Sequence, residues 1–286
     1  MSAARDEAEF IDLVLDSVAK QTIRPLRHVV VDDGSKDGTD KKIQQWADKE
    51  SFIVAKTQGN VNTRSFGSKV AALNAAYEDL KNLDFDYIGC LDADITLPPS
   101  YYERIIGRMR EHPKLGVASG LCLQKSNRGW IKIMTNDRHV PGAMQFFTRE
   151  CYDAIGGYQK VTVAGVDSLA EIKARAKGWE TRSFDDIFAY HHKPIGSATG
   201  GKLKTSYRRG MTDYFLGKHP LYVLAKSVRR LMAPPYVTGA AAHLYGYFSL
   251  LIAKKPMDVT AEVRRYVRTE EMEVIKSAVW RGKRPY

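Results

Sequence analysis

The sequence has few cysteines and no hydrophobic run long enough to cross a membrane. The three cysteines among its 286 residues, Cys90, Cys122 and Cys151, are widely spaced and form no Cys-x-x-Cys pair. This odd, scattered set excludes a disulfide framework and a zinc knuckle, and it favours a reducing compartment. The apolar segment at 237–253 is shorter than the roughly 20 residues of a membrane span. The start of the chain, MSAARDEAEF, lacks the apolar run of a signal peptide.

Nothing in the composition indicates disorder or a fibrous protein. Hydrophobic residues make up 44% of the chain and charged residues 27%, which is close to the averages of soluble globular proteins. A chain of 286 residues is long enough to bury a full core, either as one large domain or as a domain with an appendage.

Negative charge is scarce in the last third of the chain. Residues 193–286 contain 18 Lys and Arg against 6 Asp and Glu, a net charge of +12, whereas the residues before them carry a net charge of −1. The whole positive excess of the chain therefore lies in this last third. Such asymmetry indicates a catalytic body followed by a segment that meets an anionic partner: a phospholipid surface, a lipid-linked phosphate or nucleic acid.

Apolar residues in the first half alternate between helical spacing and short buried runs. Spacings of three and four residues predict helices, and runs too brief for a helix predict strands. Strands that alternate with such helices indicate a parallel sheet with helices on its faces. The predicted helices are 10–18, 43–47 and 70–80, and the predicted strands are 28–31, 52–55 and 87–91.

The pattern becomes mixed further along the chain. It predicts a helix at 101–109, a strand at 116–123, and irregular strand and loop at 128–147. A short helix is expected to end at Gly156-Gly157. Asp167 stands at the N-cap position of a further helix, which Gly178 is expected to end.

Two acidic clusters follow predicted strands. Asp32 and Asp33 come directly after the strand at 28–31, and Asp92-Ala93-Asp94 follows the strand at 87–91. In parallel α/β sheets, ligands bind at the carboxyl ends of the strands. Asp32 or Asp33 is suited to accept hydrogen bonds from a nucleobase or a ribose. The alternative is an Asx turn that only caps the next helix.

The Asp92-Ala93-Asp94 cluster suits a divalent cation. Hard cations such as Mg²⁺ and Mn²⁺ prefer oxygen ligands, and they often combine one or two protein carboxylates with substrate phosphates. Alternate residues at a strand end point in different directions, so one carboxylate can bind the cation while the other meets the ribose or a water. A solvated loop without a ligand is the alternative interpretation.

The order and spacing of several motifs resemble the inverting family 2 glycosyltransferases. A D-D-G-S turn at 32–35 precedes the D-x-D motif at 92–94 by 60 positions, which is similar to the spacing in that family. The resemblance runs from about Ala4 to Ser197. Further segments that resemble the family are ARDEAEFI at 4–11, SKVAALNAA at 68–76, PGAMQFFTRECYDAIGGY at 141–158, GVDSLAEIKARAKGWETRSF at 165–184 and AYHHKPIGS at 189–197.

This resemblance implies a particular α/β fold. It is the Rossmann-like, glycosyltransferase A-type fold of nucleotide-diphospho-sugar transferases, with a mostly parallel central sheet. In the family a strand precedes the ARDE-like loop, and here only Met1, Ser2 and Ala3 stand before it. We therefore expect the first strand to be missing, or its place to be filled by another element. The expected domains are a nucleotide-sugar-binding catalytic domain at 1–197 and a basic, mainly helical C-terminal region at 198–286.

The resemblance also implies a base and a metal site. Asp167 corresponds to the residue that deprotonates the acceptor hydroxyl, so that direct attack inverts the anomeric carbon. Asp94 is the expected ligand of a Mg²⁺ or Mn²⁺ cofactor. His191 aligns with a late metal-binding histidine of the family, and the adjacent His192 is the alternative.

The expected donor is a nucleotide-diphosphate sugar. The side chains expected to bind it are Asp32, Asp33 and Asp92. Lys69 and Arg5 are expected to neutralise its phosphates, although a solvated helix face is the alternative for Lys69. Glu7 is expected either to contact the ribose or to cap its helix, and the sequence does not decide between the two.

The chain departs from the family pattern at two further points. Val166 stands where the family usually has a glutamate before the base, which removes a neighbour that tunes Asp167. The Q-x-x-R-W motif of processive polysaccharide synthases is not recognisable after Asp167. We therefore expect transfer of single sugars rather than polymerisation.

Basic residues flank the apolar segment at 237–253. Arg229 and Arg230 precede it, and Lys254 and Lys255 follow it. Such flanks suit a helix that lies among lipid headgroups, and an ordinary buried helix is the alternative. Similar family members build exopolysaccharides or surface glycans on lipid carriers. We therefore expect a cytoplasmic protein, peripheral on the inner face of the cell membrane, with a saccharide or lipid-linked acceptor.

Other functions fit parts of the sequence. A sugar transferase that acts on polyprenyl phosphate is the closest rival enzyme, and a nucleotidyltransferase would need a glycine-rich basic loop that is not present. A catalytically silent binding protein is the alternative from a different class. Nucleic-acid binding would require aromatic residues interleaved with a basic groove, and Tyr207-Arg208-Arg209 is only a fragment of such a pattern.

Overall fold

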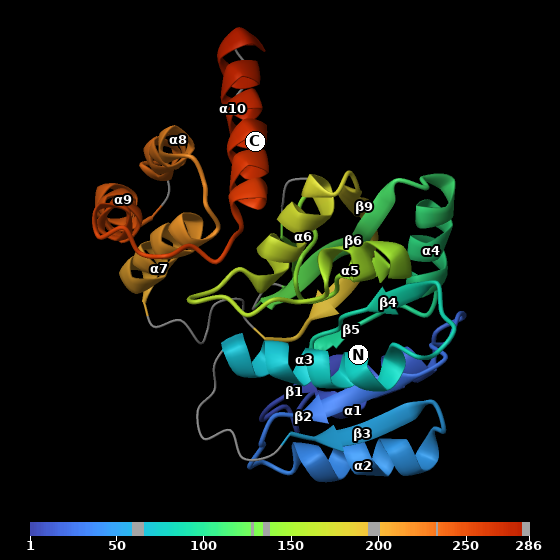
Figure 1. Cartoon of the computed structure of the whole chain (residues 1–286). Coiled ribbons are helices and arrows are strands. Elements are labelled where there is room, and N and C mark those ends of the chain that lie inside the picture. The colour runs from blue at the N-terminus through green and yellow to red at the C-terminus, as the bar shows by residue number, and fades with distance from the viewer. Residues whose placement is uncertain (59–65, 127–128, 134–137, 194–200, 233, 282–286) are drawn as a thin grey trace. The chain divides into compact units, whose positions relative to one another are not determined.

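The computed structural model describes residues 1–58, 66–126, 129–133, 138–193, 201–232 and 234–281. The chain divides into two compact units, whose elements are labelled in Figure 1. The first unit comprises Met1–Lys160 and Val166–Ile195, and the second comprises Val161–Gly165 and Gly196–Tyr286. The division lies near the boundary expected after residue 197, but the sequence did not predict that Val161–Gly165 joins the second unit.

The first unit begins with a parallel sheet in the strand order β1-β2-β3. Every residue of the middle strand, β2, is buried. Val30 packs with α1 and α2, and its neighbours Val29 and Val31 pack with α3, because successive side chains of a strand point to opposite faces. The elements are β1 (Ser2–Ala4), α1 (Ile11–Ala19), β2 (His28–Asp32), α2 (Thr39–Lys49), β3 (Ile53–Thr57) and α3 (Phe66–Leu80).

The expectation that the first strand is missing is wrong, because Ser2–Ala4 forms it. β1 pairs in parallel with β2 along its whole length. On the other side, the ammonium nitrogen of Met1 donates to the carbonyl oxygen of Gly89 at 2.9 Å, and the carbonyl oxygen of Met1 accepts from the amide of Leu91 at 3.1 Å. A very short segment therefore fills the central position and pairs backbone groups that would otherwise be buried without partners.

The second sheet of this unit is mixed. Its strand order is β4-β8-β6-β9-β5, with β7 paired to β6. β6 and β9 run parallel, whereas the other pairs are antiparallel. The irregular segment expected at 128–147 contains β7 and the start of β8. The elements are β4 (Tyr87–Gly89), β5 (Ile95–Thr96), α4 (Tyr101–Glu111), β6 (Leu115–Ser126), β7 (Gly129–Lys132), β8 (Phe146–Thr148), α5 (Arg149–Ile155), α6 (Val166–Ala176) and β9 (Glu180–His191).

Glycines end two helices of the first unit as expected. Gly156 follows α5 in the left-handed conformation with φ of 69°, and Gly178 follows α6 with φ of 88°. Asp167 is the second residue of α6 and not its N-cap. Its carboxylate therefore lies in the first turn of the helix.

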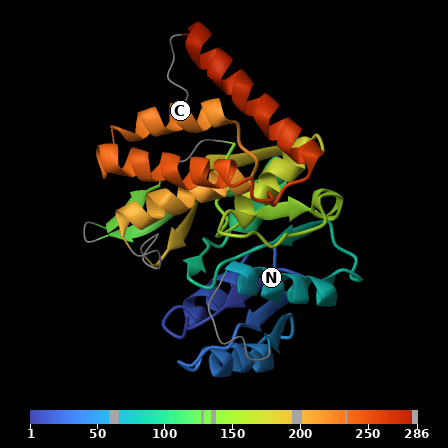
Figure 2. The ribbon, with the colours of Figure 1, turned by 60° about the vertical axis from the view of Figure 1, so that its left-hand side comes forward.

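The second unit contains the helices α7, α8 and α9, which lie side by side (Figure 2). Their shared core includes Tyr214 of α7, Val223 of α8 and Tyr247 of α9. α9 covers most of the apolar segment at 237–253 and buries one face against the other helices, as expected for an ordinary packed helix. Among the described residues, no helix has the length and apolar character needed to cross a bilayer. The elements are α7 (Lys202–Phe215), α8 (Pro220–Arg230), α9 (Tyr236–Ile252) and α10 (Ala261–Arg281).

Charged side chains are buried where α7, α8 and α9 meet. The carboxylate of Asp213 accepts a hydrogen bond from Lys226 Nζ at 2.8 Å and lies 2.8 Å from His243 Nε2. Lys218 Nζ lies 3.1 Å from the same carboxylate. Burial opposes ionisation of Asp213, but the charges of Lys218 and Lys226 hold its pKa well below the usual value. Removing one partner of such a network leaves a buried charge unpaired, which costs roughly 3 to 5 kcal/mol.

Two glycines allow α7 and α9 to approach closely. A Cβ added at Gly210 would lie 2.0 Å from the carbonyl oxygen of His243, and one added at Gly246 would lie 2.3 Å from that of Tyr207. Any side chain at these positions must push the two helices apart.

We expect Gly246→Ala to lower the free energy of unfolding by roughly 1 to 3 kcal/mol, because the methyl group overpacks the contact. Urea unfolding measures this change, and amide hydrogen exchange should become faster in α7 and α9 but not in β2. The matched control is Gly107→Ala in α4, where an added Cβ meets nothing within 4 Å. At Gly107 the substitution should raise the free energy of unfolding by up to about 1 kcal/mol, because alanine favours a helix more than glycine does. Equal effects of the two substitutions would contradict the close-packing explanation.

Candidate active site

The loops that follow β1 and β2 hold each other in place. The amide of Asp6 donates to the hydroxyl of Ser35 at 3.0 Å, and the carboxylate of Asp6 accepts from the amide of Lys36 at 2.9 Å. The amide of Ala8 donates to the carboxylate of Asp37 at 2.9 Å. These bonds fix the carboxyl ends of two neighbouring parallel strands, where a ligand is expected to bind.

Asp32 and Asp33 have different surroundings. The carboxylate of Asp32 accepts from the amides of Gly34 at 3.1 Å and Ser35 at 3.2 Å. These bonds form the Asx-type turn that the sequence offered as the alternative to a ligand-binding role for this carboxylate. Arg5 Nη1 lies 3.7 Å from Asp33 Oδ2. In the described part of the chain, Arg5 Nη1 and Asp33 Oδ1 are buried without a hydrogen-bond partner. Because such atoms cost free energy when unpaired, they mark a position for a polar ligand.

Backbone pairing brings Asp94 and His191 together. Ile95 of β5 lies opposite His191 of β9, and the amide of His192 donates to the carbonyl oxygen of Asp94 at 3.0 Å. His191 Nε2 therefore lies 3.1 Å from Asp94 Oδ2, although the two residues are 97 positions apart. The side chains are only 14% and 13% exposed.

The two side chains shift each other's pKa. Burial alone would raise the pKa of Asp94, but the hydrogen bond and charge of His191 lower it, helped by Lys193 and Lys69. Burial alone would lower the pKa of His191, but the hydrogen bond and charge of Asp94, together with those of Cys122, raise it to about 10. Without a bound cation, His191 itself is therefore the positive partner of Asp94.

The adjacent histidines point to different surroundings. His192 Nε2 lies 2.9 Å from Thr96 Oγ1. The ring of His192 stacks on Phe10, with centroids 5.6 Å apart, and meets Trp130 edge-on at 5.5 Å. His191 therefore contacts Asp94, whereas His192 packs among aromatic rings. The role of His191 as a metal ligand stays a prediction.

Lys69 is the common neighbour of the predicted acidic residues. Its Nζ lies 2.5 Å from Asp92 Oδ1. Burial alone would lower the pKa of Lys69, but the charge and hydrogen bond of Asp92 raise it, and Asp167 adds to the effect. The charge of Lys69 also contributes to the low pKa of Asp94. One cation from α3 therefore acts on three carboxylates from two separate segments, 92–94 and the start of α6, and Lys69 is not only part of a solvated helix face.

Asp167 lies against the loop that contains Gly142. A Cβ added at Gly142 would lie 2.6 Å from Asp167 Cβ and 2.7 Å from its Oδ2, so only glycine fits without a shift. Glu171, one turn further along α6, is buried and accepts from the amide of Val140 at 3.1 Å. The loop and the start of α6 are thereby fixed together.

The sequence did not predict the residues that hold this loop. Gln145 is fully buried, and its Nε2 donates to the carbonyl oxygen of Val140 at 3.1 Å and to that of Asp167 at 3.4 Å. The hydroxyl of Tyr158 donates to Gln145 Oε1 at 2.7 Å. The feature of the sequence that could have indicated this role is that Gln145, an uncharged polar residue, interrupts the apolar run at 144–147.

Glu7 has a partner that the sequence also did not predict. Its carboxylate lies 2.5 Å from Lys193 Nζ, and its side chain is 8% exposed. Lys193 Nζ also lies 5.5 Å from the centroid of the Phe10 ring. The loop after β1 and the segment after β9 thus meet through an ion pair. The one feature of the sequence that could have indicated a role for Lys193 is its position directly after the two histidines.

The donor set fits a cation that arrives with phosphates. Among the described residues, no group of three His, Cys, Asp or Glu side chains could hold a metal ion by itself. Asp94 and His191 offer one carboxylate and one imidazole in contact. Mg²⁺ commonly takes one or two protein carboxylates and fills its other positions with substrate phosphates and waters. Asp94 and His191 are therefore compatible with a divalent cation bound together with a diphosphate.

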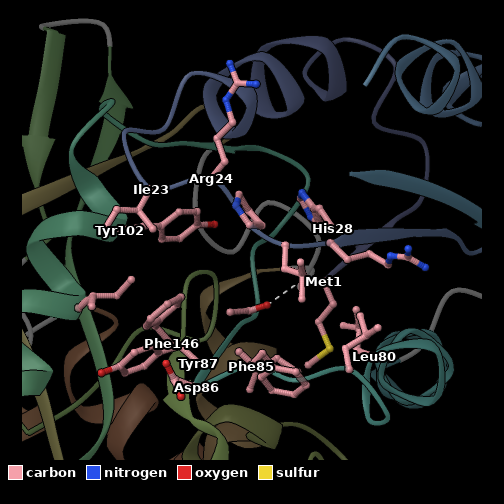
Figure 3. A pocket seen from close by; sticks show the side chains of 17 residues that line it. Met1, Ile23, Arg24, His28, Leu80, Phe85, Asp86, Tyr87, Tyr102 and Phe146 are labelled. Atoms are coloured by element: carbon pink, nitrogen blue, oxygen red, sulfur yellow. Dashed lines mark hydrogen bonds between the residues drawn. The ribbon is translucent and has the colours of Figure 1, made fainter. Parts of the chain in front are cut away.

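A cavity of about 200 Å³ lies elsewhere in the first unit (Figure 3). It is lined by residues at the amino ends of the strands, among them Met1, His28 and Tyr87, and by the apolar side chains of Leu80 and Phe146. None of the predicted site residues lines it. This cavity is therefore at the wrong end of the sheet for the chemistry expected from the carboxylates.

The parallel sheet with carboxylates at its strand ends defines an α/β protein whose ligand site is expected at the carboxyl ends of the strands. Residues 3–158 match the family model described as glycosyl transferase family 2, and the chain belongs to that family. It is therefore a glycosyltransferase with the glycosyltransferase A-type fold, as the motifs predicted.

Solved structures are similar over most of the chain. The mannosyltransferase PcManGT from Pyrobaculum calidifontis, in complex with GDP-Man and Mn²⁺, matches with a TM-score of 0.57 and 18% identity over 99% of this chain and 75% of that one. S. aureus TarS 1-349, in complex with UDP-GlcNAc, matches with a TM-score of 0.55 and 14% identity over 88% of this chain and 71% of that one.

Curated relatives match over a shorter stretch. The poly-β-1,6-N-acetyl-D-glucosamine synthase of Staphylococcus aureus strain COL is 29% identical over 118 residues. The enzyme of the same name from Staphylococcus epidermidis is 27% identical over 118 residues. The match covers 41% of this chain and about a quarter, 26%, of these relatives' length.

We expect Asp94→Asn to lower the pKa of His191 from about 10, because the hydrogen bond to the carboxylate and its charge are lost while burial remains. The raised pKa means that protonation of His191 stabilises the folded protein fully below pH 6.5, and that this stabilisation is lost as the pH rises through 10. An NMR titration of the His191 ring in metal-free protein measures both effects. Asp92→Asn is the matched control, since Asp92 bonds to Lys69. If His191 titrates at the same pH in Asp94→Asn and in the unchanged protein, the ion pair is not formed in solution.

Proposed function

We propose that the chain is an inverting, metal-dependent glycosyltransferase that moves a sugar from a nucleotide-diphosphate donor to an acceptor hydroxyl. The observation that carries this proposal is the geometry of the 92–94 segment: Lys69 Nζ lies 2.5 Å from Asp92 Oδ1, and His191 Nε2 lies 3.1 Å from Asp94 Oδ2. The charge of Asp167 also raises the pKa of Lys69. This effect indicates that donor-side carboxylates and the expected base share one site.

The donor binds at the ends of β1, β2 and β4. Arg5 and Asp33 supply the buried polar atoms that have no partner within the described chain. Asp92 follows β4 and bonds to Lys69 of α3. Asp32 supports the turn rather than the ligand. The similar structures of PcManGT and TarS were obtained with GDP-Man and UDP-GlcNAc, and this supports a nucleotide sugar as the donor class.

The divalent cation, Mg²⁺ or Mn²⁺, would be held by Asp94 and His191. When bound, it supplies positive charge that neutralises the leaving diphosphate. Before it binds, His191 is protonated and paired with Asp94, so cation binding must release that proton. Lys69 adds a permanent positive charge to the same region.

Asp167 takes the proton of the acceptor hydroxyl. As the hydroxyl oxygen forms its bond to the anomeric carbon, the bond from that carbon to the diphosphate oxygen breaks, and the nucleoside diphosphate leaves with the electron pair. A single in-line displacement inverts the anomeric configuration. Gly142 leaves room for the Asp167 side chain, and Gln145 holds the backbone of Asp167 by donating to its carbonyl oxygen.

The product is proposed to be part of a polysaccharide or cell-surface glycan. The named activity of the staphylococcal relatives supports this class. The acceptor is a saccharide or a lipid-linked saccharide at the cytoplasmic face of the membrane. The proposal is tested by screening nucleotide sugars with Mn²⁺ or Mg²⁺ for release of free nucleotide diphosphate. Parallel assays with a saccharide and with a polyprenyl phosphate acceptor separate the two rival transferases.

We expect Asp167→Asn to lower turnover by about 10²- to 10⁴-fold, because general-base assistance is lost. Donor binding, measured by calorimetry in the presence of Mn²⁺, should stay within about twofold. The matched control is Asp84→Asn, an exposed carboxylate in the loop before β4. Unchanged turnover in Asp167→Asn would remove this residue from the mechanism.

We expect His191→Ala to raise the Mn²⁺ concentration needed for half-maximal turnover by at least about tenfold, since one of two protein ligands is lost. His192→Ala removes only contacts with Thr96 and aromatic rings, so it serves as the matched neighbour and should shift the concentration little. The reverse order of effects would assign the cation to His192.

A further inference from the structure

α8 carries a stripe of apolar side chains on its outer side. Leu221, Leu224, Val228 and Leu231 follow one another at steps of three and four residues, and each is between 40% and 65% exposed. Met232, in the turn that continues the helix, is 74% exposed. These five residues are called the α8 face. We expected the lipid-contacting segment at 237–253. α9, which covers most of that segment, packs its small residues against α7.

The opposite side of α8 points inward and buries Val223 together with polar groups. Ser227 is 2% exposed, and its Oγ lies 2.7 Å from His243 Nδ1. Lys226 Nζ bonds to both oxygens of Asp213, at 3.0 and 2.8 Å. A helix at a water-facing surface normally turns its apolar stripe inward and its charges outward. α8 buries Val223 but leaves a second apolar stripe exposed, and a contiguous exposed apolar stripe marks an interaction surface.

The charges around this face have one sign. Between Asp213 and Asp258 the sequence contains no acidic residue, while it contains Lys218, Lys226, Arg229, Arg230, Lys254 and Lys255. Arg229 is exposed at the end of α8. Burial and the nearby charge of Arg209 lower the pKa of Arg230, so cations from α7 and α8 gather at this end. The complement of such a surface is apolar and anionic.

We propose that the α8 face docks onto an anionic phospholipid bilayer. The leucines and Val228 enter the boundary between headgroups and acyl chains, and Arg229 and Arg230 contact the anionic headgroups. This inference deepens the proposed function, since it rests on an acceptor at the membrane and names the surface that meets it. A second copy of the chain is disfavoured, because a two-fold contact through this face would oppose arginine to arginine.

The test is flotation of the purified full chain with vesicles of phosphatidylcholine, alone or with 30% phosphatidylglycerol as the anionic lipid. The variant Leu224→Gln/Val228→Gln should reduce the binding constant for anionic vesicles by at least about tenfold, because apolar area no longer leaves water. The matched control is Leu13→Gln/Leu26→Gln, which changes two leucines of the first unit that are 51% and 64% exposed. Arg229→Gln should weaken binding to anionic vesicles by about fivefold.

Insertion of the face is measured separately from affinity. The three native cysteines are buried, so an environment-sensitive fluorophore can be attached selectively to Val228→Cys and, as a control, to Leu13→Cys. Anionic vesicles should shift the emission of the label at position 228 to the blue and leave that at position 13 unchanged. This measurement does not depend on whether the double variant folds well.

The outcomes separate this inference from the proposed function. Release of nucleotide diphosphate without vesicles should be the same in the double variant and the unchanged protein. If donor turnover is absent but flotation depends on the α8 face, the proposed function fails and the docking surface stands. If the double variant floats as well as the control variant, or the label at 228 does not respond, the inference is overturned. It is equally overturned if sedimentation shows a dimer that the double variant abolishes.

Discussion

The pairing of β5 with β9 is the constraint on which the candidate site depends. β5 has only two residues, Ile95 and Thr96, yet its register against β9 sets Asp94 beside His191 across 97 positions of sequence. Each of these side chains is buried and would be costly alone, so each needs the other's charge. The protonated imidazole of His191 therefore holds Asp94 in position at the place where a cation and phosphates are proposed to bind.

The two units place charge and apolar surface in opposite ways. The first unit buries valine-rich strands and presents its carboxylates at strand ends, where a water-soluble, phosphorylated ligand can reach them. The second unit buries Asp213 with its lysines and His243, and it leaves the α8 face exposed. These arrangements match partners of different polarity. The first suits a nucleotide sugar, and the second suits a lipid surface.

Sequence patterns predicted the alternating elements of the first sheet, because periodicity reports local burial. They also identified the family, because Asp32-Asp33, Asp92-Asp94 and Asp167 lie in short contiguous motifs. They did not predict β1, since three residues are too few to show a period and only pairing with β2 and Met1's bonds define the strand. They also missed the roles of three polar residues whose partners are distant in the sequence. Gln145 bonds to Asp167, Glu171 to Val140 and Lys193 to Glu7, over 22, 31 and 186 positions. Only the folded chain brings these pairs together.

The register of β9 has a consequence for how such a chain can change in length over evolution. Side chains of a strand alternate between faces, so the loss or gain of one residue between Phe188 and His191 would turn every following side chain to the other face. Tyr190 or His192 would then stand opposite Ile95 in place of His191. Chains descended from a common ancestor with this one should accordingly vary in length in the exposed turn between α1 and β2, or at the irregular part of β9, while residues 188–191 keep a constant count.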